Sequence, residues 1–128
     1  MSLRVVRLGS PRVRDEGTRI GTVRRPPRGV AKADWAKRDF FDVWLPELAP
    51  SEVLLKSARA AQTDSEWKAF TRGYRAEMSK PEPQHLLQLL SALSQTSAFS
   101  VGCYCENEQR CHRSILRELL KAHGALFA

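Results

Sequence analysis

The sequence predicts an α/β fold, a small layered domain in which helices cover a short, largely parallel sheet. A β-branched, apolar run opens the chain at residues 3–9, and a second lies near the other end at residues 98–104. Helical apolar periodicity fills much of the chain between and after these two runs. Strands that alternate with helices are typical of this architecture. Because 128 residues is the usual length of one domain, we expect residues 1–128 to form a single domain.

Two further segments have strand character. Residues 18–23 form a shorter strand that runs into a loop at residues 24–29, where two adjacent prolines exclude both strand pairing and helix. Residues 40–48 fit two patterns, because some apolar side chains alternate and others lie four positions apart. Pro46 opposes a long helix, so we expect an edge strand or an extended segment there.

Four segments have helical periodicity, namely residues 49–60, 63–80, 82–95 and 112–123. Ser51 is expected to cap the first helix and Asp64 or Ser65 the second, while Gly124 ends the last. The residues expected to face the core are Trp67, Phe70, Tyr74 and Met78 in the second helix, Leu86, Leu89, Leu90 and Leu93 in the third, and Ile115, Leu116, Leu119 and Leu120 in the fourth.

The positive charge is concentrated at one end of the chain. The net charge is +7, and residues 1–38 carry 11 Lys and Arg against 3 Asp and Glu. Such asymmetry indicates an anionic partner, either nucleic acid, a nucleotide or a small phosphate or sulfate. A solvated basic surface that only aids solubility is the alternative, because charge alone says little about specific binding.

All three cysteines lie within one nine-residue window, residues 103–111. An odd number of cysteines does not make a disulfide scaffold, and the chain start has no apolar run typical of a signal peptide. No stretch is long and apolar enough for a membrane span. We therefore expect a cytoplasmic protein with reduced thiols and without a membrane partner.

Cys111 is the predicted reactive thiol because it lies at the start of the last helix. Free backbone amides and the helix dipole favour negative charge there, and Arg110 and Arg113 flank the cysteine. These features predict a lowered pKa for Cys111 and a nucleophilic thiolate. The same geometry without thiol reactivity is a pocket for an anion.

Other residues are assigned supporting roles at the same site. Cys103 is a candidate resolving thiol and His112 a candidate base. Because ligands gather beyond the carboxyl ends of parallel strands, we expect Arg25 and Arg28 to face the thiol loop and bind an anion together with Arg110 and Arg113.

Two alternatives for the cysteine window stay open. Cys103, Cys105, Cys111 and His112 are metal-ligand types, but their C-x-C-x5-C-H spacing fits structural zinc sites poorly, so we expect no metal and no cofactor. In the second alternative, the cysteines are small buried residues without chemistry. A tyrosine-phosphatase loop is excluded, because no Arg lies six residues after Cys103 or Cys105.

The motifs W-L-x-E-L-A-P-S, W-x-x-F-x-x-x-Y and C-x7-C-H-R resemble the domain-of-unknown-function family 488 (DUF488), and within it the YeaO-like branch, over residues 3–121. The resemblance implies a compact α/β domain and suggests an enzyme. By position, the family's cysteine motif corresponds to Cys103, Cys111, His112 and Arg113. This chain departs from the usual V-D-R-L-W-P-R-G of the branch, because it reads TVRRPPRG at residues 22–29.

These observations together predict a thiol-dependent enzyme or redox protein that acts on a small anionic ligand, similar to phosphate or sulfate, at the carboxyl edge of the sheet. The alternative is a non-catalytic module that binds nucleic acid or a nucleotide through the basic N-terminal third. The sequence predicts neither a substrate nor an oligomeric state.

Overall fold

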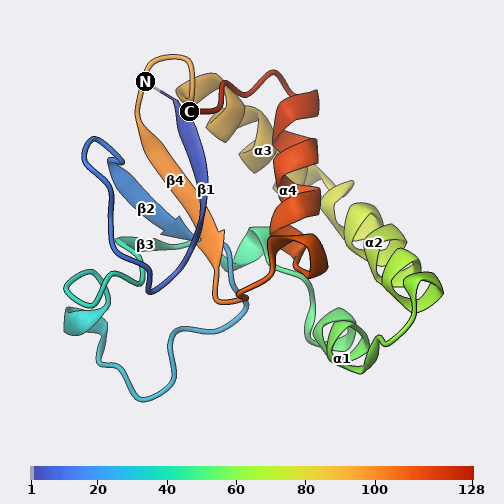
Figure 1. The fold of residues 1–128 in the computed structure, drawn as a ribbon. Helices are drawn as coiled ribbons and strands as arrows, with labels where there is room; N and C mark the ends of the chain where they lie inside the picture. The colour runs from blue at the N-terminus through green and yellow to red at the C-terminus, as the bar shows by residue number, and fades with distance from the viewer. Residues whose placement is uncertain (1) are drawn as a thin grey trace.

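The computed structural model describes residues 2–128 and contains a parallel sheet flanked by helices (Figure 1). The sheet has the strand order β1-β4-β2-β3, and every neighbouring pair is parallel. Its strands are β1 (Leu3–Arg7), β2 (Thr18–Gly21), β3 (Val43–Trp44) and β4 (Phe99–Cys103). The predicted α/β class is confirmed, and residues 43–44 form the edge strand expected within residues 40–48.

The helices lie on one side of the sheet (Figure 1). They are α1 (Glu52–Ala60), α2 (Asp64–Met78), α3 (Pro81–Leu93) and α4 (His112–Ala122). The main core lies between them and the sheet, where Leu3 and Val101 pack with Tyr74, Leu87 and Leu116. None of the helices in residues 2–128 is long and apolar enough to cross a membrane.

The helix ends follow local capping chemistry. Ser51 caps α1, as expected, because its side chain accepts a hydrogen bond from the Leu54 amide. The cap of α2 is Thr63, not Asp64 or Ser65, since the Thr63 hydroxyl accepts from the Glu66 amide. Gly124 adopts a φ of 88° directly after α4 and so ends that helix.

The predicted inner face of α3 is partly wrong. Leu89 and Leu93 are 53% and 41% exposed, whereas Leu87 and Leu90 are buried. Pro83 and Ser91 share the buried face, and the Ser91 hydroxyl donates to the Leu120 carbonyl of α4. A leucine-rich helix offers more than one apolar face, and only tertiary packing selects between them.

A charged cluster is buried on the face of the sheet opposite the helices. Arg19 is 0% exposed, and its guanidinium donates to Glu16 at 2.7 and 2.9 Å. The remaining guanidinium nitrogen donates to the carbonyls of Ser10 and Asp39, both at 2.8 Å, and the Ser100 hydroxyl donates to Glu16. These bonds fix the loop after β1 to the sheet, so Arg19 is a structural part of the basic N-terminal third.

Candidate functional site

The candidate site lies at the carboxyl end of β4, where the chain loops back to begin α4 (Figure 1). Cys103 is the last residue of β4, and Cys111 is the N-cap residue of α4 with extended backbone. Between them, a 3-10 turn at Glu108–Arg110 is capped by the Asn107 side chain, which accepts from the Gln109 amide. This turn reverses the chain and returns Cys111 to the strand end.

The reversal brings two buried cysteines and a histidine together. Cys103 and Cys111 are 1% and 2% exposed, and both thiols are free. Their sulfur atoms and one imidazole nitrogen of His112 all lie within 4.8 Å of one another. Cys105 is a third free cysteine, and unlike the other two it is exposed. The site therefore combines one accessible thiol with two interior thiols.

His112 is oriented by a backbone hydrogen bond. Its Nε2 lies 2.7 Å from the carbonyl oxygen of Thr22, which can only accept, so Nε2 carries the proton. The lone pair of Nδ1 then faces the Cys111 sulfur at 3.8 Å. Burial lowers the pKa of His112 to about 4, although the Thr22 hydrogen bond opposes this shift. The imidazole is therefore neutral near pH 7, and its Nδ1 lone pair can accept a hydrogen bond from a thiol.

The lowered pKa predicted for Cys111 is wrong. Interaction with Cys103 lowers this pKa, but interaction with Cys105 and burial outweigh it and raise the pKa to about 11. Interactions with the Cys105 and Cys111 thiols, together with burial, also raise the pKa of Cys103. Sequence reasoning placed Cys111 correctly at the helix start but did not anticipate its burial.

Sequence reasoning considered Cys105 only as a metal ligand and missed it as the accessible thiol. Interactions with the Cys103 and Cys111 thiols lower its pKa well below the ordinary value, and the nearby positive charge of Arg113 acts in the same direction. The available signal was its position in a polar stretch, CENEQR, just beyond a buried strand. These interactions favour the thiolate form of the exposed cysteine.

Arg113 is a buried cation beside these thiols. It is 4% exposed, and its Nη2 donates to the Cys105 carbonyl oxygen at 2.6 Å. Within residues 2–128, its Nε is the one buried side-chain nitrogen or oxygen that has no hydrogen-bond partner. A buried N–H without an acceptor is costly, which suits a position that receives an anion.

The other predicted anion-binding arginines are not gathered around the thiols. Arg110 pairs with Asp64 at 2.8 Å and lies over the Trp67 ring, and exposed Arg25 pairs with Glu52 at 2.9 Å. Arg28 is exposed and has no ion pair or side-chain hydrogen bond within the described chain. The loop at residues 24–29 nevertheless adjoins the thiol loop, because the Tyr104 hydroxyl donates to the Arg25 carbonyl.

The same cluster has the donor types of a metal site. Cys103, Cys111 and His112 supply two sulfurs and a nitrogen, which are the ligands that zinc prefers, and Cys105 could add a fourth. The hydrogen bond from His112 Nε2 to a carbonyl resembles the orientation of metal-bound histidines. Chain reversal therefore produces a compact donor set that the linear spacing did not suggest.

A comparison with protein-family models supports the family resemblance that the sequence motifs indicated. A family model described as DUF488-N3a, the active DUF488-N3 subclade, matches residues 3–124. Neither the comparison with curated proteins nor that with solved structures gives a match.

Proposed function

The chain belongs to the DUF488 family, and on that premise we propose that it is a thiol-dependent redox enzyme acting on a small anionic ligand at the carboxyl edge of the sheet. One observation carries the proposal: an exposed thiol, Cys105, interacts with two buried thiols, and these two lie beside a neutral imidazole. The description of the matched subclade as active supports catalysis. The YeaO-like branch stays a prediction.

The proposed first step uses Cys105 as the nucleophile. Its thiolate attacks one sulfur of a disulfide that carries an anionic group, which breaks the substrate S–S bond and forms a mixed disulfide. The other substrate sulfur leaves as a thiolate and takes a proton from water. In this proposal, the buried Arg113 holds the anionic group through its free Nε–H, and Arg25 and Arg28 form an outer positive border.

The second step uses a buried thiol as the resolving group. Cys111 attacks the Cys105 sulfur, and during this attack its proton is relayed through Nδ1 of His112, which lies 3.8 Å from the Cys111 sulfur. This attack forms a Cys105–Cys111 disulfide, while the second substrate thiol leaves and takes the proton back from His112. The substrate is reduced by two electrons and the protein dithiol is oxidised, so turnover needs an external dithiol. Cys103 supports the pair or replaces Cys111 as the resolving thiol.

Reaction with dithiobis(nitrobenzoate), a disulfide with two carboxylates, tests both steps. The reduced protein should release about two equivalents of coloured thiolate per chain, and Cys111→Ser about one if Cys111 resolves the mixed disulfide. Cys105→Ser should lower the initial rate by about 100-fold near pH 6.5. Cys103→Ser is the matched control for loss of a buried thiol. A first thiolate released just as fast from Cys105→Ser would refute the proposal.

Metal binding is the alternative that shares these residues, and elemental analysis separates the two. The proposal expects thiols that alkylate readily in freshly purified protein. About one equivalent of zinc per chain that protects all three cysteines from iodoacetamide would replace the redox proposal with a metal site.

Nucleic-acid or nucleotide binding through the basic N-terminal third is the weaker candidate. Several of its arginines are engaged within the protein, since Arg12 pairs with Asp42, Arg19 with Glu16, and Arg24 donates to two backbone carbonyls. Binding to mixed oligonucleotides that weakens steeply with salt would favour this candidate.

A further inference from the structure

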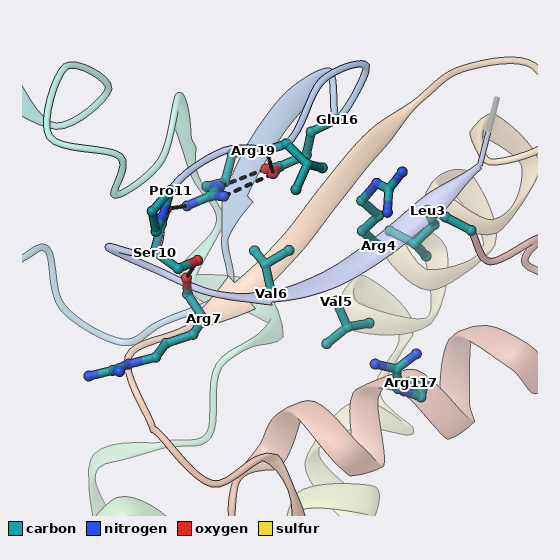
Figure 2. A pocket seen from close by; sticks show the side chains of 12 residues that line it. Leu3, Arg4, Val5, Val6, Arg7, Ser10, Pro11, Glu16, Arg19 and Arg117 are labelled. Atoms are coloured by element: carbon teal, nitrogen blue, oxygen red, sulfur yellow. Dashed lines mark hydrogen bonds and ion pairs between the residues drawn. The ribbon is translucent and has the colours of Figure 1, made fainter.

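A groove runs along the outer strand β1, apart from the thiols (Figure 2). Its volume is about 330 Å³. The strand contributes Arg4, Val5, Val6 and Arg7, the loop after it contributes Ser10, and α4 contributes Arg117. The proposed thiol chemistry uses none of these residues, so the groove calls for its own explanation.

The edge of β1 already accepts a parallel strand from this chain. The Leu3 amide donates to the Leu126 carbonyl at 2.8 Å, and the Ala128 amide donates to the Leu3 carbonyl at 2.9 Å. These two bonds make a parallel bridge between Leu3 and Phe127. The edge therefore has the twist and access that strand addition requires.

The next positions on the same edge have free backbone groups. Because alternate residues of a strand direct their backbone groups to the same edge, Val5 and Arg7 follow Leu3. The Arg7 carbonyl is used by the amide and hydroxyl of Ser10. The Val5 carbonyl and the Arg7 amide have no partner within residues 2–128. In an added parallel strand, the amide of one residue would donate to the Val5 carbonyl, and the carbonyl of the same residue would accept from the Arg7 amide.

The charges beside this edge favour an acidic occupant. Arg4 makes no ion pair or side-chain hydrogen bond within the part of the chain that the structure describes. Arg7 forms an ion pair with Glu106 at 3.4 Å and donates to the Tyr104 carbonyl at 3.4 Å, and the ion pair is weak because both side chains are half exposed or more. Arg117 adds a third cation, although Glu108 holds it in two hydrogen bonds. Figure 2 shows Arg4 and Arg117 on either side of Val5.

From these observations we propose that the β1 edge binds an extended acidic peptide segment of another protein, which adds a parallel strand beside Val5. A peptide fits better than a nucleic-acid backbone, because the Val5 carbonyl requires a hydrogen-bond donor and a phosphodiester has none. Arg4, which has no side-chain partner within residues 2–128, meets the carboxylates that lie on one face of the extended peptide.

Fluorescence anisotropy with a labelled octapeptide of alternating Glu and Val tests the proposal. We expect a Kd of about 10–100 μM at low salt, as is typical of a small interface, and no binding of the matched Lys-Val peptide. Arg4→Glu should weaken binding by about fivefold or more, and Arg72→Glu, on the exposed side of α2, should change it by less than about twofold. Equal losses in the two variants would overturn the proposal.

Backbone methylation of the probe tests strand pairing directly. Only alternate peptide amides face β1, and in this probe they belong either to the Glu or to the Val residues. N-methylation of the residue type that faces β1 should weaken binding by about tenfold or more, whereas N-methylation of the other type should not. Equal affinity of the two methylated peptides would exclude strand addition. Tighter binding of a thymidine oligonucleotide that is also lost in Arg4→Glu would assign the groove to nucleic acid instead. Cys105→Ser should leave peptide binding unchanged, which separates this result from the thiol proposal.

Discussion

Arg19 and Arg113 are both buried arginines, but their surroundings differ in kind. Arg19 places its guanidinium nitrogens on Glu16 and on two backbone carbonyls, and Ser100 completes the carboxylate. Arg113 has one carbonyl contact, no paired carboxylate within residues 2–128, and an Nε without a partner. A buried charge whose hydrogen bonds are all made holds the fold together. A buried charge with a free donor lacks a partner from the fold, and our proposal gives this donor of Arg113 to the ligand.

The largest expected effect breaks the satisfied cluster. Arg19→Met leaves the Glu16 carboxylate buried without its counter-charge, so the free energy of unfolding should fall by about 3–5 kcal/mol. Urea unfolding measures this loss. The double variant Glu16→Gln/Arg19→Met should lose less than the two single variants together, because one interaction is counted in both.

Arg113→Met is the matched change at the thiol site. It removes a buried cation that has no acid partner, so we expect a stability loss of about 1 kcal/mol or less. A loss as large as that of Arg19→Met would show that both arginines serve the fold alike.

The pH dependence of stability sharpens the same comparison. Burial raises the pKa of Glu16, but hydrogen bonds from Arg19, Ser100 and the Val13 backbone outweigh it and lower the pKa to about 2. A carboxyl whose pKa is lower in the folded state stabilises the protein above its ordinary pKa, and this contribution fades as the pH falls. The stability difference between the native protein and Glu16→Gln should therefore shrink from about pH 5 to about pH 2.

His112 titrates in part of the same range, because burial lowers its pKa to about 4. It is present in both proteins, so the difference between their unfolding free energies isolates Glu16. A difference that stays constant down to pH 2 would contradict the role given to the Glu16 carboxylate.

The sequence predicted the elements better than it predicted which side chains meet. Periodicity located the strands and the buried face of α2, because these depend on local spacing. It failed for Leu89 and Leu93, where two apolar faces compete and only packing decides. At the site, the helix start at Cys111 was predictable from the residues around it.

The burial of Cys111 and the exposure of Cys105 depend on how the chain reverses direction at residues 104–111. That path is set by the Asn107 cap and by contacts with distant parts of the chain, such as the Thr22 carbonyl on His112. The Asn107 cap has a local signal, because asparagine favours a helical start, but the contact between Thr22 and His112 has none. The fold class could therefore be read from periodicity, whereas the assignment of the accessible thiol required the tertiary structure.

Arg113→Gln tests what the arginine with the free Nε–H does for the proposed reaction. The positive charge of Arg113 helps to lower the pKa of Cys105, and in the proposal Arg113 also binds the anionic group of the substrate. The rate with dithiobis(nitrobenzoate) should fall by about tenfold, and the rate with neutral dithiodipyridine by less. Equal losses with the two disulfides would restrict Arg113 to thiolate stabilisation and remove its role in anion binding.

The smallest expected effect concerns Arg110, which the sequence assigned to the same anion-binding set as Arg113. In the structure it turns outward to the largely exposed Asp64 and lies over Trp67. Arg110→Gln should therefore cost less than about 1 kcal/mol of stability, as is typical of exposed ion pairs. The rate of Cys105 alkylation near pH 6.5 should change by less than about twofold, because the charge is directed away from the thiols and screened by solvent. A tenfold loss would mean that the outer arginine, and not the buried one, controls the thiolate, and the contrast between Arg19 and Arg113 would then say nothing about the site.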